Sequence, residues 1–364
     1  MIDSVMKRIA AICVPLLLLT GCTKTYNPND AISIDVSGFT TTFKCGDAYA
    51  FDGEIKTTYV DGTTRTLKAN EYYIDYSSYI PFSLEKANIN IIYGQQTFTY
   101  TVTRQRREAF KILMIGNSFS DDAEAFLKPL ATAYGLNSND VVVADLYIGG
   151  CSIDMHVDNA KNNKNAYIYR DWYGAASNDE NYVSIKDALN KEDWDFITVQ
   201  QASGYSGIKE SYNNLPYLVN YIKSNCKNKK VNIAWLQTWA YAKDSTHADF
   251  AKYHNNQNEM YEAICDAYKE KVAPNKNIID LIPCGTAIQN AREGVFGDTL
   301  NRDGYHLSLT TGRFIAALTA FTSITGYLPE NVPICPEEYS QEEEQCIKNA
   351  VKNALLNRLV VTNN

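Results

Sequence analysis

Three residues with the chemistry of acyl transfer occur in this chain in a consistent order. Ser118 ends the run Gly116-Asn117-Ser118 after an apolar segment, and far downstream Asp303 lies three positions before His306. A carboxylate this close to an imidazole can hold one ring nitrogen while the other ring nitrogen faces a serine hydroxyl. The sequence therefore predicts Ser118 as a nucleophile, His306 as its general base and Asp303 as the residue that orients the imidazole.

The segments around these residues alternate between strands and helices from about residue 109. Short apolar runs predict strands buried on both faces, at 111–115, 141–144, 196–199, 231–236 and 278–282. Apolar residues at intervals of three, four or seven predict helices, one with Phe250, Tyr253, Met260, Tyr261, Ile264 and Tyr268 and one with Phe314, Leu318 and Phe321. This alternation predicts a parallel sheet with helices on both faces and a ligand site beyond the carboxyl ends of the strands.

The segment 109–364 resembles the SGNH (GDSL-like) hydrolases. Three separated blocks carry the resemblance, namely Ile115-Gly116-Asn117-Ser118-Phe119-Ser120, Ile148-Gly149-Gly150-Cys151-Ser152 and Arg302-Asp303-Gly304-Tyr305-His306. The resemblance implies an α/β protein with a three-layer α/β/α, flavodoxin-like fold and a triad of Ser118, His306 and Asp303. It also implies that the backbone N–H groups of Ser118 and Gly150 stabilise the oxyanion.

The chain departs from this family at another block, where Gly-x-Asn-Asp is usual. Here Val199-Gln200-Gln201-Ala202 stands in its place. A glutamine amide carries the same N–H donors one methylene further from the backbone. Because adjacent strand residues face opposite ways, we expect one glutamine to complete the oxyanion hole, Gln200 by preference and Gln201 as the alternative.

Several further residues are candidates for contact with a substrate. Asn117 neighbours the nucleophile, His156 follows the Gly150 loop, and Trp239 and Tyr241 follow the fourth apolar strand, where their rings suit stacking on a sugar. We expect His247 and His254 to be surface or packing residues. A long insert after the second strand can supply a substrate-facing lid, with aromatic residues Tyr167, Tyr169, Trp172 and Tyr173.

A different pattern fills residues 32–104. Short alternating apolar runs at 32–36, 54–60, 63–67 and 97–102, with an Asp61-Gly62 turn, predict β-hairpins. Together with Tyr93-Gly94 and the last alternating strand, this pattern resembles bacterial immunoglobulin-like modules. We expect a small all-β sandwich that serves as a spacer or a binding module.

The first residues are typical of a secretion signal. Lys7-Arg8 precede an apolar run from Ile9 to Leu19. The end of that run, Leu18-Leu19-Thr20-Gly21-Cys22, resembles a bacterial lipobox, which implies that residues 1–21 are removed and that Cys22 is lipidated. With Thr23 in place of Asp after that cysteine, the resemblance implies an outer-membrane lipoprotein, facing either the periplasm or the cell surface. Residues 22–31 then form a tether.

Composition limits the partners. The 364 residues are 45% hydrophobic and 21% charged with a net charge of −8, which does not favour nucleic acid as a partner. The mature chain keeps seven cysteines without metal-binding spacing, at 45, 151, 226, 265, 284, 335 and 346. We expect free thiols, with a Cys335–Cys346 bridge as the alternative, and we expect neither a metal nor a cofactor. The oligomeric state stays open.

These observations predict a serine esterase of the cell envelope. The 26 tyrosines and the absence of an apolar lid segment favour an O-acetyl ester of a carbohydrate as the substrate. The alternatives are a lipase, lysophospholipase or thioesterase of the same superfamily and a glycan-binding protein without catalytic activity.

Overall fold

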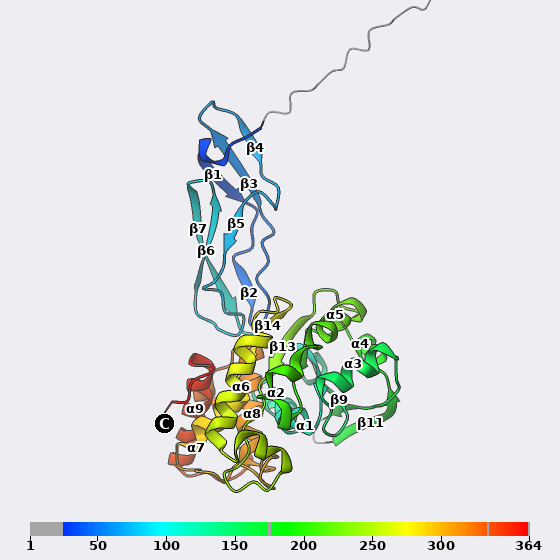
Figure 1. Ribbon diagram of the computed structural model, residues 1–364. Coiled ribbons are helices and arrows are strands. Elements are labelled where there is room, and N and C mark those ends of the chain that lie inside the picture. Colours follow the sequence, from blue (N-terminus) through cyan, green and yellow to red (C-terminus); the bar gives the residue numbers. More distant parts are fainter. Residues whose placement is uncertain (1–24, 174–175, 333–334, 363–364) are drawn as a thin grey trace, which may run out of the picture.

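The computed structural model describes residues 25–173, 176–332 and 335–362. The predicted signal at 1–21 and the predicted lipidation site Cys22 lie outside these residues. Within the described ranges, no helix combines the length and the apolarity that crossing a bilayer requires. The chain forms an elongated β region that stands on a larger α/β domain (Figure 1).

The β region contains two small sheets. One has the strand order β1-β3-β4 and the other has the order β2-β7-β6-β5. Their bounds are β1 (Ala31–Ser37), β2 (Thr42–Lys44), β3 (Glu54–Tyr59), β4 (Thr64–Thr66), β5 (Tyr73–Asp75), β6 (Ala87–Tyr93) and β7 (Gln96–Gln105), preceded by the 3-10 helix η1 (Pro28–Asp30). The hairpin predicted at Asp61-Gly62 is confirmed, because β3 pairs antiparallel with β4 across it. The immunoglobulin-like assignment stays a prediction.

Alternation along the strands builds the core of this region. In β6, every second side chain is buried, as the period of two of a strand requires. Residues of both sheets meet in one apolar cluster, which includes Ile55, Tyr59, Leu67, Ile89, Ile91, Tyr93 and Val102. The two sheets therefore enclose a shared core.

The α/β domain has a seven-stranded sheet with the order β11-β10-β9-β8-β12-β13-β14. Five neighbouring strands are parallel, namely β9 (Val141–Tyr147), β8 (Phe110–Gly116), β12 (Phe196–Val199), β13 (Asn232–Leu236) and β14 (Ile278–Ile282). Numbered along the chain from β8, their order is 2-1-3-4-5, which is that of flavodoxin-like folds. The predicted α/β fold with its parallel sheet is confirmed.

The insert after β9 adds an antiparallel hairpin to this sheet. Strand β10 (Tyr167–Tyr173) pairs with β9 and with β11 (Ala176–Val183). Tyr167 and Tyr169 are buried in the apolar cluster on one face of the sheet. They are therefore core residues, and the expectation that they line a substrate-facing lid is wrong.

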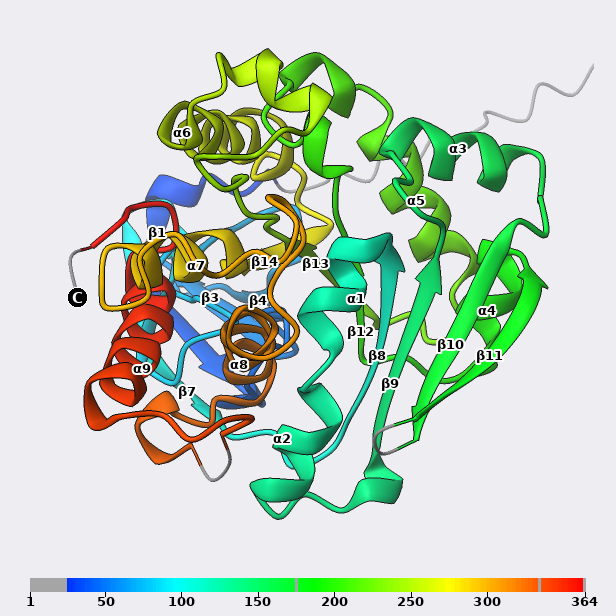
Figure 2. The same ribbon diagram turned by 90° about the horizontal axis from the view of Figure 1, so that it is seen from below.

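Helices cover both faces of the sheet (Figure 2). Those packed on one face are α1 (Ser118–Glu124), α2 (Leu127–Ala133), α6 (Gln257–Ala267), α7 (Cys284–Arg292), α8 (Thr311–Thr325) and α9 (Gln341–Leu356). Those on the other are α3 (Ile153–Lys161), α4 (Ile185–Lys191) and α5 (Leu215–Asn225). Shorter turns are η2 (Ser138–Asp140), η3 (Ser203–Tyr205), η4 (Lys209–Tyr212), η5 (Ala248–Tyr253), the π-helix η6 (Tyr268–Val272) and η7 (Pro329–Asn331).

Two sequence expectations about these helical segments have definite outcomes. Phe314, Leu318 and Phe321 are buried on α8, as predicted. The helix expected over 250–268 is instead divided among η5, α6 and the first residue of η6. The break between η5 and α6 occurs because His254 and Asn255 have φ values of +54° and +53°, which interrupt a right-handed helix.

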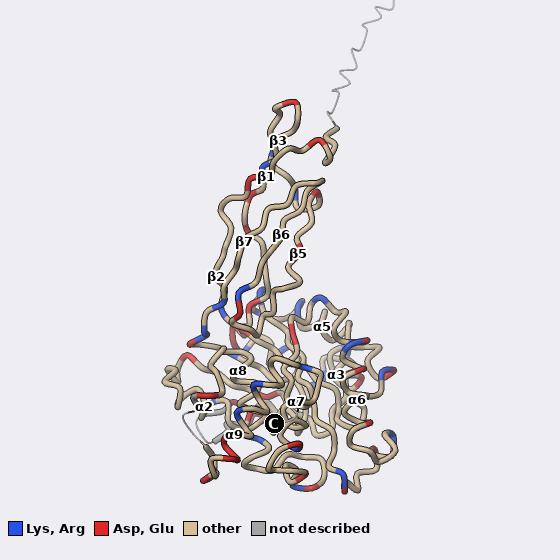
Figure 3. Tube along the Cα trace, turned by 90° about the vertical axis from the view of Figure 1, so that its left-hand side faces the viewer, with Lys and Arg blue, Asp and Glu red and all other residues tan. Residues whose placement is uncertain are grey.

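Buried contacts around Arg107 join the two parts of the chain. The Arg107 guanidinium donates to the Cys45 carbonyl at 2.9 Å, pairs with the Asp47 carboxylate and lies 4.9 Å from the centre of the Phe196 ring. The Cys45 thiol in turn donates to the Ser323 carbonyl of α8 at 3.3 Å. Charged residues of both signs gather at this junction (Figure 3). The β region is therefore packed directly against the α/β domain.

The cysteines of the described residues are all free thiols. Cys335 is exposed and Cys346 is buried, and no bridge joins them. The alternative of a Cys335–Cys346 disulfide is therefore wrong for this structure. Burial raises the pKa of the Cys45 thiol to about 12, which keeps this thiol protonated and unreactive at neutral pH.

Candidate active site

Ser118 lies where the central strand β8 meets helix α1. Asn117 caps this helix, since its side-chain oxygen accepts the N–H of Phe119 at 3.0 Å. Ser118 is the first residue of α1, so its own backbone N–H has no partner inside the helix. Gly116 makes the turn possible, because a Cβ there would meet the Ser120 hydroxyl at 2.5 Å. The turn presents both the hydroxyl and the N–H of Ser118 at the sheet edge where ligands bind in such folds.

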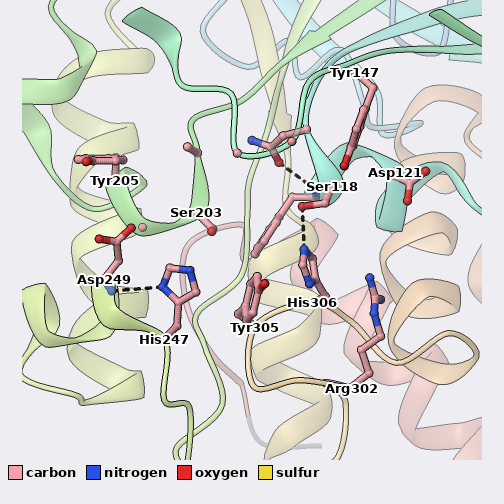
Figure 4. Close-up of a pocket in the computed structure, with 16 residues that line it drawn as sticks. Ser118, Asp121, Tyr147, Ser203, Tyr205, His247, Asp249, Arg302, Tyr305 and His306 are labelled. Carbon is pink, nitrogen blue, oxygen red and sulfur yellow. Dashed lines mark hydrogen bonds between the residues drawn. The ribbon is translucent and has the colours of Figure 1, made fainter. Parts of the chain in front are cut away.

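The predicted triad is assembled in the structure, and Figure 4 shows the contact between Ser118 and His306. His306 Nε2 lies 2.8 Å from Ser118 Oγ, and His306 Nδ1 lies 2.7 Å from Asp303 Oδ2. Both distances are those of hydrogen bonds. Ser118 and the distant Asp303–His306 turn are therefore joined in one continuous chain of hydrogen bonds.

A tight turn fixes the carboxylate of this path. Asp303 Oδ1 accepts the N–H groups of Tyr305 at 3.2 Å and His306 at 2.8 Å. Partial burial acts to raise the pKa of Asp303, but hydrogen bonds from the side chain and backbone of His306 and from Tyr305 outweigh it and lower that pKa. An ionised Asp303 accepts the Nδ1–H of His306, which leaves Nε2 as the acceptor for the Ser118 hydroxyl.

A buried carboxylate ties the loop of His306 to the helix of Ser118. Asp122 lies one helical turn after Ser118 on α1, and its side chain is 0% exposed. Its Oδ1 accepts from Arg302 Nη1 at 3.0 Å and from Arg313 Nε at 2.7 Å, and its Oδ2 accepts the N–H of Leu307 at 2.8 Å. Because Arg302 and Leu307 flank the triad turn, Asp122 sets the position of His306 relative to the nucleophile.

The triad opens into a pocket of about 470 Å³, within the range of small-molecule sites. Its walls come from the loops that follow β8, β9, β12 and β13 and from the triad turn. The lining residues are Asn117, Ser118, Phe119, Asp121, Tyr147, Gly149, Gly150, Ala202, Ser203, Gly204, Tyr205, His247, Asp249, Arg302, Tyr305 and His306.

The predicted oxyanion donors have different positions. Ser118 and Gly150 both line the pocket, and Gly150 has the left-handed φ of +64° that favours glycine. Gln200 is not among the lining residues; its amide donates to Asn117 Oδ1 at 2.8 Å. The Asn117 amide donates in turn to the Cys151 carbonyl at 3.0 Å. The structure therefore places Gln200 behind the nucleophile turn, where it connects three loops at the strand ends.

The alternative donor Gln201 is also engaged elsewhere. Its Nε2 donates to the hydroxyl and carbonyl of Ser211 at 2.9 and 3.0 Å, and its Oε1 accepts the N–H groups of Ile153 and Ala202. Neither glutamine amide points to Ser118. The physical reason is that hydrogen bonds to groups of neighbouring loops hold both side chains, Gln200 through Asn117 and Gln201 through Ser211 and Ile153.

Three of the four predicted substrate contacts lie behind the pocket wall. His156 is fully buried beside Tyr167, with Nδ1 2.9 Å from the tyrosine hydroxyl, and burial lowers its pKa to about 4. Trp239 stacks on Phe119 and donates to the Tyr305 carbonyl. The structure does not bring either ring to the pocket; both are core residues that support its lining.

Tyr241 has the same supporting role. It is buried, and its hydroxyl lies 2.9 Å from the Ser203 hydroxyl, behind the lining of the pocket. Asn117 is the one of the four that lines the pocket. Aromatic residues directly after a strand end were thus expected at the surface of the site, but here they fill the layer beneath it.

Sequence reasoning missed several lining residues. Tyr147 ends β9 and Asp121 lies one turn after Ser118, so strand ends and helix periodicity contained a signal for both. His247, expected as a surface or packing residue, lies in the pocket wall with Asp249. No local pattern indicated this pair, because a long loop brings it back to the site. His254 is exposed beside Glu259, in agreement with the prediction.

An acidic cluster lies under one side of the pocket. Side-chain oxygens of Asp121, Glu124 and Asp145 lie within 4.8 Å of one another. Burial, with the nearby charge of Asp121, raises the pKa of Asp145, and the Arg170 cation acts in the opposite direction. Arg170 bonds Asp121 at 2.8 Å and stacks on the Tyr147 ring at 4.0 Å. We interpret the cluster as an ion-pair network that holds this wall.

The triad lies at the carboxyl ends of the parallel strands of the flavodoxin-like sheet, where ligands bind in folds of this strand order. The chain belongs to the DUF4886 family, described as a domain of unknown function, whose family model matches residues 111–354. A DUF4886 protein from Bacteroides uniformis, known from its crystal structure, shares 42% sequence identity with this chain. The two structures match with a TM-score of 0.66, and the match covers 70% of this chain and 97% of that one.

More distant solved structures include two hydrolases. An acetylxylan esterase from Geobacillus stearothermophilus is 14% identical over 59% of this chain and 94% of its own, with a TM-score of 0.37. LAE5, an α/β hydrolase from the metagenome of Lake Arreo, is 12% identical over 60% and 95%, with a TM-score of 0.38. A search of the curated proteins found no match.

Proposed function

We propose that this protein is a serine esterase that removes O-acetyl groups from carbohydrates. The observation that carries the proposal is the continuous chain of hydrogen bonds Ser118–His306–Asp303, with distances of 2.8 and 2.7 Å, in which Ser118 and His306 line the pocket. A serine activated by a neighbouring base and oriented carboxylate is the arrangement required for a covalent acyl intermediate.

In this mechanism the Ser118 oxygen attacks the ester carbonyl carbon while His306 Nε2 takes the hydroxyl proton. The tetrahedral oxyanion accepts the N–H groups of Ser118 and Gly150, and each such donor is typically worth on the order of 100- to 1000-fold in rate. His306 then gives its proton to the departing alcohol oxygen as the carbon–oxygen bond breaks. A water molecule, deprotonated by His306, attacks the acyl-enzyme and releases the acid together with free Ser118.

The lining supports a polyhydroxylated alcohol as the leaving group. Tyr147, Tyr205 and Tyr305 present flat rings with polar tips, a combination that suits the faces and hydroxyls of sugars. Hydroxyl, carboxylate and imidazole groups of Ser203, Asp249 and His247 interrupt any apolar path that a long acyl chain would follow. These features favour an acetyl ester on a sugar over a fatty acyl ester.

Acetate release from acetylated xylan and mucin, together with acetyl and octanoyl nitrophenyl esters, tests the proposal. We expect Ser118→Ala and His306→Ala to abolish acetyl ester hydrolysis and labelling by a fluorophosphonate probe, while the exposed Ser77→Ala control retains both. Retained turnover in both triad variants would contradict the mechanism. Faster octanoyl turnover supports a lipase or thioesterase instead, and a folded protein without labelling or turnover supports glycan binding alone.

We also propose that Cys22 anchors the protein to the bacterial outer membrane. The support is the basic and apolar leader that ends in Leu18-Leu19-Thr20-Gly21-Cys22. Incorporation of labelled fatty acid into the wild type and into Cys22→Ser, followed by separation of inner and outer membranes, tests this location. Equal labelling of both proteins would rule out Cys22 as the anchor.

A further inference from the structure

One wall of the pocket carries an imidazole that the proposed mechanism does not use. His247 precedes η5 and is half-buried, and its ring packs against the rings of both Tyr305 and Tyr241, whose centres lie 4.7 and 5.0 Å away. Two aromatic neighbours at such distances hold the ring in one orientation. His247 is therefore a fixed group of the wall.

A backbone contact determines which nitrogen of this ring carries the proton. His247 Nδ1 accepts the N–H of Asp249 at 3.2 Å and so caps η5. A neutral imidazole that accepts at Nδ1 is a donor at Nε2. Figure 4 shows the edge of the His247 ring opposite this contact turned toward Ser203 and the interior of the pocket. The neutral ring therefore presents an N–H donor to a bound molecule.

The position of this donor relative to the triad identifies the part of the substrate that it meets. His306, which gives its proton to the departing alcohol, has its ring centre 4.0 Å from that of Tyr305, and Tyr305 lies between His306 and His247 (Figure 4). An alcohol that leaves beside His306 Nε2 and extends over Tyr305 reaches His247. The acyl carbon, in contrast, stays at Ser118.

We propose that His247 Nε2–H binds an oxygen on the alcohol part of the substrate and so selects esters of polyhydroxylated alcohols, such as sugars, over esters of simple alkyl alcohols. This assignment rests on the proposed esterase function. The hydroxyl of Ser203, which also lines this wall, lies on the side of the pocket toward which the His247 edge turns. Together these groups make the far wall a polar subsite for an alcohol with more than one oxygen.

Two substitutions separate the two contacts of the ring. Asn at 247 places an oxygen near the position of Nδ1, so it keeps the cap on Asp249 and removes the donor in the pocket. Gln reaches the position of Nε2 and keeps an N–H donor there. The rates to compare are those of acetate release from a methyl xyloside monoacetate and from ethyl acetate, whose alcohol carries no second oxygen.

We expect the wild type to prefer the xyloside ester. His247→Asn should lower kcat/KM for that ester about 3- to 10-fold, the loss of one hydrogen bond to a neutral donor, and leave the value for ethyl acetate within about twofold. His247→Gln should remain closer to the wild type. Labelling of Ser118 by a fluorophosphonate probe shows that each variant keeps a folded active site.

The outcomes are distinct. A wild type that hydrolyses neither ester contradicts the esterase proposal itself. If the wild type is active but His247→Asn lowers kcat/KM equally for both esters, or for neither, the role of His247 alone is overturned. If the Asn variant does not label, His247→Gln decides: retention of the wild-type ratio of the two rates supports the donor, and loss of that ratio overturns it.

Discussion

Substitution of Asp122 by Asn tests whether a buried carboxylate sets the geometry of the triad. The Asn side chain can still accept the N–H of Leu307, but it offers no charge to Arg302 and Arg313, which bond the carboxylate at 3.0 and 2.7 Å. We expect His306 to become less firmly held, because Arg302 and Leu307 flank its turn. Catalysis should therefore suffer more than binding.

The size of the effect follows from these contacts. Hydrogen bonds to charged groups contribute about 1.5–3 kcal/mol each. Here the arginine side chains are 31% and 20% exposed, and Arg313 keeps Asp121 as a second partner at 3.2 Å, so solvent and the remaining pair offset part of the loss. We expect the free energy of unfolding to fall by about 1–3 kcal/mol. A catalytic group displaced by about 1 Å costs up to about 100-fold, so kcat should fall roughly 10- to 100-fold.

Urea denaturation and steady-state kinetics with an acetyl nitrophenyl ester measure both quantities. Asp280→Asn is the matched control, because Asp280 also pairs with an arginine, Arg358 at 2.5 Å, but does not line the pocket. Its kcat should stay within about twofold of the wild type. An Asp122→Asn protein that is folded at the assay temperature and keeps the wild-type kcat would refute the reasoning, as would an equal loss of kcat in Asp280→Asn.

Three other variants have defined expectations. Burial lowers the pKa of His156 from 6.5 to about 4. Between these pH values the unfolded chain binds a proton at this residue and the folded protein does not. The free energy of unfolding should therefore fall by up to about 3 kcal/mol as the pH drops from 6.5 to 4. His156→Gln should remove this dependence in urea titrations at several pH values. Gly150→Ala, at φ +64°, should cost about 1 kcal/mol and lower kcat at least about 10-fold, whereas Gly149→Ala, without a positive φ, should have a smaller effect. Gln200→Ala should lower kcat only about 3- to 10-fold if its role is to hold Asn117, and a loss above about 100-fold would show that its amide reaches the oxyanion.

The sequence predicted the parallel strands because each is a short apolar run between turns. The hairpin of β10 and β11 escaped prediction, since the outer strand, 176–183, reads Ala-Ser-Asn-Asp-Glu-Asn-Tyr-Val and has little apolar character. An edge strand needs only one neighbour and does not have to be buried on both faces. Its position depends on pairing with β10, which is a tertiary property.

The residues of the triad were predictable because each lies in a short local pattern, Ser118 directly after an apolar strand and Asp303 three positions before His306. The roles of Gln200 and Trp239 were not, because the direction of each side chain depends on partners distant in the sequence, Asn117 for the first and Phe119 with Tyr305 for the second. The same holds for His247, whose loop returns to the pocket only in three dimensions. Local sequence patterns thus identify the residues of the triad but not the positions of the side chains that surround them.

Arg107 has a consequence for how the chain can be engineered. It lies in the basic stretch 104–107 where the β region meets the α/β domain, yet it is 4% exposed and bonded to Cys45 and Asp47. Fusing the α/β domain to an unrelated leader domain would leave the buried Arg107 cation without its partners Cys45 and Asp47, and we expect such a fusion to be destabilised. Residues 104–109 therefore form a rigid junction and not a hinge. We expect the β region and the α/β domain to unfold in a single thermal transition.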